Sequence, residues 1–179
     1  MRKLIIPALL VMGFASCNKP APAVVVETPI DTLGEQNKAI AGKFADAGAK
    51  GDTVGLEAIM ADDIKIYGPG LNDSITKVDE MKFWKNGWKN EWESLTFDRA
   101  AIVAFNIPAG EKFPGDWVSD WGKWTVKQKN GKPTVSFWWN GVFKVESGKI
   151  TTARAFYNMN DFFQQEGYTV TPPKAVKKK

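Results

Sequence analysis

One segment near the start of the chain's body carries apolar residues at helical spacing. Within residues 31–49 the apolar positions form one stripe on a polar and alanine-rich background, at Leu33, Ile40, Phe44 and Ala47. This pattern predicts an amphipathic helix with one buried face. Gly48 and Gly51 are expected to end it.

A second, shorter helix and a strand are predicted next. Asp52 or Thr53 can cap the first turn of this helix, and the Asp62–Asp63 pair is expected to close it. Residues 64–67 then alternate between apolar and polar positions, which is typical of a strand. The glycines and proline of residues 68–70 break the chain sharply after it.

A third helix is predicted after a cap at Ser74 or Thr76, because tryptophans recur at intervals of four residues. Trp84, Trp88 and Trp92 fall on one stripe, and lysines take the opposite face. Three indoles on one stripe indicate packing against something large. The sequence leaves two interpretations open, an ordinary hydrophobic core or the wall of a cavity.

Long alternating segments follow from residue 93 onward. They predict strands over residues 95–107, 117–128, 134–145 and 150–157. Turn signals such as Asn130-Gly131 separate them, so we expect an antiparallel meander. Alternation in the third strand places Trp138 and Trp139 on opposite faces of the sheet. In the first strand, Arg99 is in phase with four apolar residues, Phe97, Ala101, Val103 and Phe105.

The start of the chain has the pattern of an export signal. Two basic residues precede an apolar run from Leu4 to Phe14, too short to cross a hydrocarbon core of about 30 Å as a helix. The run ends at small residues and Cys17, so residues 1–16 resemble a bacterial lipoprotein signal peptide, in which that thiol is lipidated. In that family a leucine usually stands where this chain has Phe14. The alternative is an ordinary signal peptide with an incidental cysteine.

The resemblance to a lipoprotein signal implies an anchored protein. Residues 17–30 are rich in Pro, Ala and Val and are typical of an extended tether. We therefore expect a lipoprotein of the bacterial cell envelope, held to a membrane through Cys17 and facing the periplasm or the exterior.

Composition limits the chemistry of this chain of 179 residues. It has no histidine and one cysteine, which excludes Ser-His-Asp and Cys-His catalysis and any disulfide within the chain. The net charge of +4 comes from the ends, at Arg2, Lys3, Lys174, Lys177, Lys178 and Lys179. Without these six, 18 basic residues face 20 acidic ones, so we expect no nucleic-acid partner. Residues 168–179 are interpreted as a solvated basic tail, and we expect neither metal nor cofactor.

Residues 50–70 read KGDTVGLEAIMADDIKIYGPG. This succession of a Gly-Asp start, an apolar helix, an Asp-Asp pair and a strand ending near Gly-Pro resembles nuclear-transport-factor-2-like, or SnoaL-like, domains. The turn at residues 147–150 and the segment 154–158 resemble their last hairpin and final strand. The resemblance covers residues 31–167. It implies a cone-shaped, cystatin-like α+β fold, with N-terminal helices packed on a curved antiparallel sheet.

The resemblance also implies a pocket between the sheet and the helices, but the chain departs from the family's enzymes. In the steroid isomerases of this family, the general base is an Asp just before the Pro that follows the first strand. Gly68 occupies that position here. The polyketide-cyclase and dehydratase branches often use histidine, which this chain lacks. These departures favour a binding protein over an enzyme.

The candidate ligand contacts are aromatic or basic residues expected to reach this pocket: Tyr67, Trp84, Trp88, Arg99, Trp139 and Arg154. A buried guanidinium is costly unless it is paired, so Arg99 requires a carboxylate, a carbonyl or an anionic ligand. Asp120 is a candidate partner or base, and these two residues are the candidates for catalysis. Their structural alternatives are an ion pair or an exposed position for Arg99, and an exposed turn for Asp120.

All eight tryptophans lie between residues 84 and 139. They predict either an aromatic cavity or a core combined with a dimer interface, because the outer sheet face commonly forms homodimers in this family. Trp138 and Trp124 are expected on that outer face. We expect a lipid-anchored domain that binds a small apolar or amphipathic ligand in an aromatic-lined cavity. The alternatives are an isomerase, cyclase or hydrolase that uses Asp and Arg, and a protein-interaction module.

Overall fold

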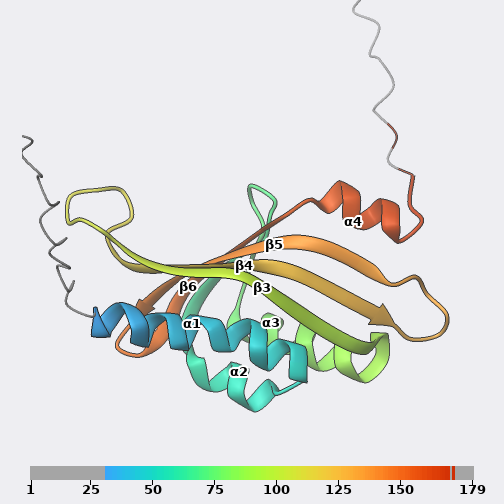
Figure 1. Cartoon of the computed structure of the whole chain (residues 1–179), viewed down its shortest axis with the longest axis horizontal. Coiled ribbons are helices and arrows are strands. Elements are labelled where there is room, and N and C mark those ends of the chain that lie inside the picture. Colours follow the sequence, from blue (N-terminus) through green and yellow to red (C-terminus); the bar gives the residue numbers. More distant parts are fainter. Residues whose placement is uncertain (1–30, 170, 172–179) are drawn as a thin grey trace, which may run out of the picture. The chain divides into compact units, whose positions relative to one another are not determined.

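The computed structural model describes residues 31–169 and residue 171 (Figure 1). The predicted signal peptide, the tether with Cys17 and most of the predicted tail lie outside the described residues. Within the described part of the chain, no helix is both long enough and apolar enough to cross a membrane.

The first two predicted helices are confirmed. Helix α1 (Thr32–Lys50) begins after Asp31, whose carboxylate accepts a hydrogen bond from the Gly34 N–H at 3.0 Å. Helix α2 (Thr53–Ile59) is capped in the same way by Asp52. The prediction for its end is wrong, because the helix stops at Ile59 and the strand begins at Met60, so the Asp62–Asp63 pair lies within the strand.

The helix predicted to carry three tryptophans is divided. Helix α3 (Lys77–Asn86) begins at Thr76, which forms a capping box with Asp79. A π-helical turn, η1 (Gly87–Glu91), follows it, and Trp92 already belongs to a strand. The indoles still meet, since the ring centroids of Trp84 and Trp92 lie 5.6 Å apart. Spacing along the sequence therefore predicted the aromatic cluster but not the elements that carry it.

The described residues form one six-stranded sheet in the order β2-β1-β6-β5-β4-β3. Its strands are β1 (Met60–Tyr67), β2 (Ser74–Ile75), β3 (Trp92–Ile107), β4 (Gly115–Gln128), β5 (Val135–Glu146) and β6 (Lys149–Tyr157). Neighbours are antiparallel, except that β1 runs parallel to β6. The predicted meander is confirmed as β3 to β6, and the α+β fold is confirmed with it.

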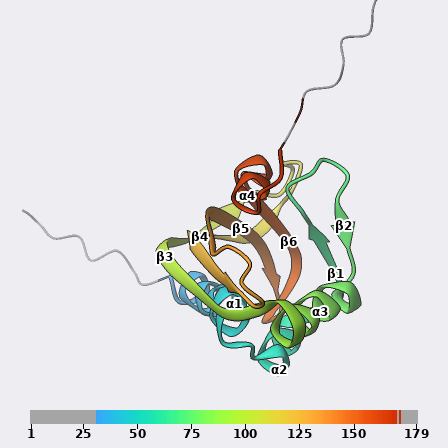
Figure 2. The same ribbon diagram turned by 90° about the vertical axis from the view of Figure 1, so that its right-hand side faces the viewer.

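Helices α1, α2 and α3 cover one face of the sheet, here called the inner face (Figures 1 and 2). The opposite face is called the outer face. A further helix that the sequence did not predict, α4 (Met159–Gln165), follows β6. Its Gln165 side chain pairs with the backbone of Ser136 in β5, accepting from the N–H at 2.9 Å and donating to the carbonyl at 2.8 Å. The β5–β6 pairing ends at Trp139 and Tyr157, and the Gln165 amide bonds to the β5 backbone beyond that point.

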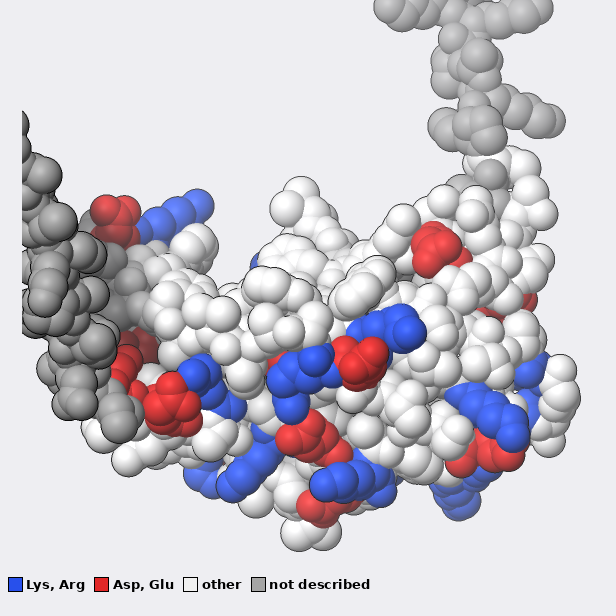
Figure 3. Space-filling view, in the orientation of Figure 1, with Lys and Arg blue, Asp and Glu red and all other residues white. Residues whose placement is uncertain are grey.

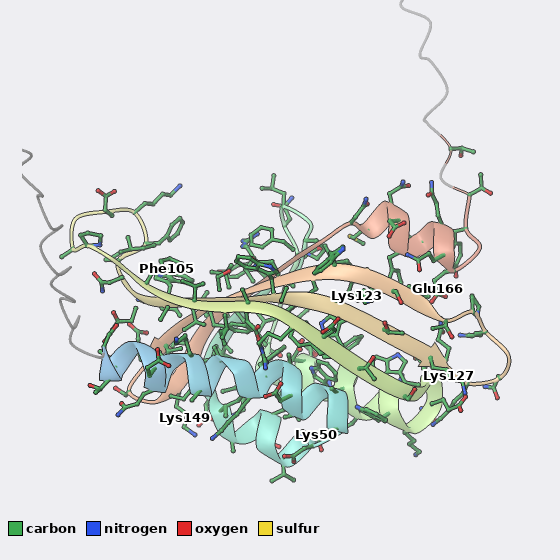
Figure 4. The ribbon with its side chains drawn as sticks, in the orientation of Figure 1. Lys50, Phe105, Lys123, Lys127, Lys149 and Glu166 are labelled. Carbon is green, nitrogen blue, oxygen red and sulfur yellow. The ribbon has the colours of Figure 1, made fainter. Side chains whose placement is uncertain are left out.

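The predicted alternation of β3 is wrong beyond Arg99, because the strand contains a bulge. The register with β4 shifts between Arg99 and Ala101, so one extra residue reverses which side chains face inward. Arg99 stays on the inner face with Phe97. Val103 and Phe105, predicted in phase with Arg99, lie exposed on the outer face. Figure 4 labels Phe105 at its position on β3.

Candidate functional site

Aromatic rings fill the space between the inner face and the helices. The Trp124 ring centroid lies 4.8 Å from that of Phe97, 6.1 Å from Trp84 and 6.3 Å from Trp139. Phe143 adds a further ring, 6.2 Å from Trp139. Trp124, predicted on the outer face, is thus part of the core, because β4 turns its even-numbered side chains inward.

Glycines on both sides of this core let the indoles approach the backbone. A Cβ at Gly141 would overlap with the ring of Trp139, and a Cβ at Gly48 would overlap with that of Trp84. The Gly48 carbonyl also accepts a hydrogen bond from Trp88 Nε1 at 2.9 Å. The three indoles predicted to contact a ligand, Trp84, Trp88 and Trp139, are therefore seated in the packing between sheet and helices.

Arg99 joins the sheet to α1. Its Nε donates to Asp120 Oδ1 at 2.8 Å, and its Nη2 donates to Asp120 Oδ2 at 3.1 Å. Nη2 also lies 2.9 Å from Asp46 Oδ1 and from the Gly42 carbonyl oxygen, both on α1. The predicted pairing of Arg99 with Asp120 is confirmed, and Asp46 is a partner that the sequence did not indicate.

Arg99, Asp120 and Asp46 form a network of ion pairs that links the sheet to α1. Asp120 is 0% exposed, so the alternative of an exposed turn is wrong. Burial raises the pKa of Asp120, and the hydrogen bonds from Arg99 oppose that shift. The same hydrogen bonds raise the pKa of Arg99, which stays charged. Both oxygens of Asp120 accept hydrogen bonds from Arg99, and the side chain is 0% exposed, so no substrate reaches this carboxylate in the observed packing.

Tyr67 and Arg154, two more predicted ligand contacts, lie on the outer face and not with the buried indoles. They are register partners in the parallel pair of β1 and β6. The Arg154 guanidinium carbon lies 4.6 Å from the Tyr67 ring centroid and 6.0 Å from that of Phe156. The structure therefore divides the predicted site between two faces.

A shallow hollow of about 400 Å³ opens on the outer face, lined by Trp121, Trp138, Asn140 and Phe156, and bordered by Trp139, whose ring packs in the core on the inner face. Trp121, Asn140 and Phe156 are direct neighbours across β4, β5 and β6. Trp138 is 64% exposed and Trp121 41% exposed. The Asn140 amide donates to Ser119 Oγ at 2.8 Å, which fixes its orientation.

The charged residues beside this hollow on the same face are basic: Lys123 is the register partner of Trp138, and Arg154 lies 6.0 Å from the Phe156 ring centroid. Figure 3 shows charged side chains gathered over the helices, whereas the contour above the sheet is largely uncharged. The sequence indicated Trp138 for this face. Strand alternation could also have placed Trp121 and Phe156 there, because they are in phase with Lys123 and Arg154.

A second hollow, of about 410 Å³, lies between α2, β1 and α3, where residues of both charges line it. Lys77 closes one side of it by donating to Asp62 Oδ1 at 2.9 Å and to the Met60 carbonyl at 3.1 Å. Asp62 is thus engaged with a lysine, and it forms no dyad with its neighbour.

One buried carboxyl group, on α3, was not predicted from the sequence. Glu80 is 7% exposed and accepts a hydrogen bond from Trp84 Nε1 at 2.7 Å. Burial raises its pKa, and the bond from Trp84 opposes this. Burial also raises the pKa of Tyr157 on β6, with further contributions from the negative charges of Asp73 and Glu80. The available signal was that Glu80 precedes Trp84 by one helical turn on the tryptophan stripe.

No family model matches the chain, and no curated protein matches it by sequence. Three solved structures match over 74–75% of the chain. An LEH-like epoxide hydrolase from M. tuberculosis is 18% identical, is covered over 91% of its length and has a TM-score of 0.59.

Two further structures carry the name of the fold. An NTF2-like protein of unknown function from Burkholderia pseudomallei is 16% identical over 98% of its length, with a TM-score of 0.56. A protein from Catenulispora acidiphila with a ketosteroid isomerase-like fold, in complex with trimethylamine, is 17% identical over 97% of its length, with a TM-score of 0.55. The described domain of this chain therefore has the nuclear transport factor 2-like fold.

Proposed function

We propose that this protein is a lipid-anchored extracytoplasmic domain that binds a small apolar or amphipathic molecule and does not catalyse its conversion. The observation that carries the proposal is the aromatic hollow on the outer face. Interior binding would require the seated indoles to repack, whereas the outer hollow is already open. The proposed site therefore moves from the space between sheet and helices to the outer face.

The chemistry of the hollow suits a flat ligand with an acidic group. Trp121, Trp138 and Phe156 offer ring faces, and Asn140 adds an amide. The hollow is shallow and open to solvent, so a bound ligand would lie flat against these rings and would not be enclosed. Arg154 borders Phe156, and it belongs to none of the ion pairs among the described residues. The trimethylamine complex supports small-molecule binding on this fold.

Titration with 1-anilinonaphthalene-8-sulfonate tests the site, because this probe combines aromatic rings with one anionic group. We expect saturable binding that Trp138→Ala weakens by about tenfold, the equivalent of 1.4 kcal/mol. Arg154→Gln is expected to weaken it less. Val54→Ala is the matched control, since Val54 is an exposed apolar residue on α2. Equal affinity in Trp138→Ala and in wild type would exclude this site. Native mass spectrometry of the protein from its host would identify a co-purifying ligand.

The same face supports the proposal of a homodimer. Val103 and Phe105 extend the exposed apolar surface along β3, beyond the hollow. A two-fold axis through this surface would pair the patch with itself, as isologous interfaces do. Sedimentation velocity is expected to show a dimer that Phe105→Lys converts to a monomer. A wild-type protein that is monomeric at high concentration would contradict the dimer and favour the interaction-module alternative.

The anchor is tested separately from the domain. Metabolic labelling with a fatty acid is expected to mark the wild-type protein and not Cys17→Ser. Label that persists in Cys17→Ser would overturn the assignment of the signal. The enzymatic alternative with Asp120 and Arg99 receives little support, because Asp120 is fully buried and paired with Arg99, out of reach of a substrate.

A further inference from the structure

The hollow on the helical side of the domain, here called the helical groove, is basic along one element and acidic along the others. It has a volume of about 410 Å³ and lies between α2, β1 and α3, which come together beneath the sheet in Figure 2. Helix α3 contributes Lys77, Lys82 and Lys85 to its lining, whereas α2 contributes Glu57 and β1 contributes Asp62. Charges of both signs therefore face the same groove from different elements.

Among the described residues, a single ion pair joins these charges across the groove. Lys77 Nζ donates to Asp62 Oδ1 at 2.9 Å and to the Met60 carbonyl at 3.1 Å. The Lys77 side chain is 15% exposed, so these bonds hold it in place at one end of the groove. The hydrogen bond and the charge of Lys77 lower the pKa of Asp62, which keeps this pair ionised.

The other charges of the groove are not joined to one another. Glu57 and Lys85 belong to none of the ion pairs among the described residues. Lys82 is held only loosely, because its Nζ lies 3.8 Å from Asp79 Oδ1 on the same helix and its side chain is 74% exposed. An acid from α2 and two lysines from α3 are thus available to a ligand that carries both signs of charge.

Apolar groups of α3 lie between these charges. Met81 is 5% exposed and is one helical turn from both Lys77 and Lys85, so it forms the floor of the groove. Val78 is 60% exposed and lies at the rim. A ligand with an apolar side chain would cover Val78, and removing that apolar surface from water is favourable.

We propose that the helical groove binds a small zwitterion with an apolar side chain, of the amino-acid class. Its ammonium group would pair with Glu57, and its carboxylate would pair with Lys85 and Lys82. A simple anion fits less well because Glu57 repels it, and a simple cation fits less well because the lysines repel it. A hard metal ion takes six or more oxygen ligands, and no group of three metal-ligating side chains comes together among the described residues.

Titration of the purified protein with leucine tests the proposal, and the methyl resonance of Met81 at the floor of the groove is the reporter. We expect a saturable shift that weakens with added salt, because the charges of the groove are exposed and are screened. N-acetyl-leucine lacks the ammonium group, and protonated leucinamide lacks the carboxylate. Each should bind about tenfold more weakly than leucine, the equivalent of 1.4 kcal/mol.

Variants that remove one charge each test the two walls. Glu57→Gln and Lys85→Gln should each weaken leucine binding by about tenfold. Glu111→Gln and Lys43→Gln are the matched controls, since both residues are exposed and lie outside the groove, and they should bind as wild type does. Thermal melts establish that all four variants are folded.

Three outcomes overturn the site: no saturable shift with leucine, equal affinity for leucine and either analogue, or unchanged affinity in both Glu57→Gln and Lys85→Gln. The Trp138→Ala variant should leave the leucine titration unchanged, because Trp138 lies on the opposite face of the sheet. This proposal and the one for the outer hollow therefore fail independently.

Discussion

Two adjacent tryptophans of β5 differ in burial, because their side chains lie on opposite faces of the sheet. Trp139 is 8% exposed on the inner face, where Gly141 leaves room for its ring beneath the helices. Trp138 is 64% exposed on the outer face, which α1 to α3 do not cover. The abundance of tryptophan therefore does not identify a cavity in this fold. On the inner face the rings are the core, and on the outer face they are available for binding.

The largest effect is expected from truncation at the centre of the inner face. Trp124→Ala removes a ring that contacts Phe97, Trp84 and Trp139, and the remaining rings can close the gap only partly. We expect the free energy of unfolding to fall by about 3–5 kcal/mol. Urea denaturation followed by circular dichroism measures it. A loss below about 1 kcal/mol would mean that the inner rings are loosely packed, and the contrast between the faces would fail.

Next in size is the polar link of the inner face. Arg99→Met leaves Asp120 buried without its cation, and we expect a loss of about 3 kcal/mol in unfolding free energy. Asp46→Asn should cost under about 1 kcal/mol, because Asp46 is half exposed and solvent already screens its charge. The double variant Arg99→Met/Asp120→Leu should recover much of the stability. If it is no better than Arg99→Met alone, the uncompensated carboxylate is not the cause of the loss.

Alternation and capping signals were sufficient to predict most of the framework. They located α1, α2 and the start of α3, and they assigned Trp138 and Trp139 to opposite faces, because side-chain direction in a strand is a local property. The same rule failed at the Arg99–Ala101 bulge, since one extra residue reverses every later assignment. The local sequence pattern of β3 does not predict this bulge, because the bulge depends on how β3 pairs with β4.

The candidate site was less predictable, because it depends on contacts between distant segments. Helix α4 is short, and the hydrogen bonds between Gln165 and Ser136 that hold it cross 29 positions of sequence. Glu80 lies in the first turn of α3, where an acidic side chain suits the positive end of the helix whether or not it is buried. Only the tertiary structure shows that its carboxyl is buried against Trp84, while Asp79 completes the capping box with Thr76.

A smaller effect is expected in the pH dependence of stability. Because burial raises the pKa of Glu80, the folded protein holds this proton more tightly than the unfolded chain. Stability from this group is therefore full below the ordinary Glu pKa of about 4.3 and is lost as pH rises through the raised value. Glu80→Gln removes this contribution. Asp62, Asp79 and Glu146 have lowered pKa values and act in the opposite direction in both proteins, so the prediction concerns the difference between them. The urea midpoint of wild type relative to Glu80→Gln should fall as pH rises across the acidic range, and a constant difference would contradict the assigned burial.

The smallest effect is expected where the outer face is most exposed. Trp138→Ala removes an indole that is largely in solvent already, so the free energy of unfolding should change by no more than about 0.5 kcal/mol. Trp139→Ala, one position along the same strand, should cost about 3–5 kcal/mol. Urea denaturation of the pair at low protein concentration compares the two faces with residue type held constant. Repeating it at high concentration tests where the dimer forms: an unchanged small loss would fit an interface at Val103 and Phe105, whereas a larger loss would mean that the partner covers Trp138 and closes the ligand hollow. A large loss at low concentration would instead show that Trp138 stabilises the monomer, and the exposed ring could then no longer be assigned to binding.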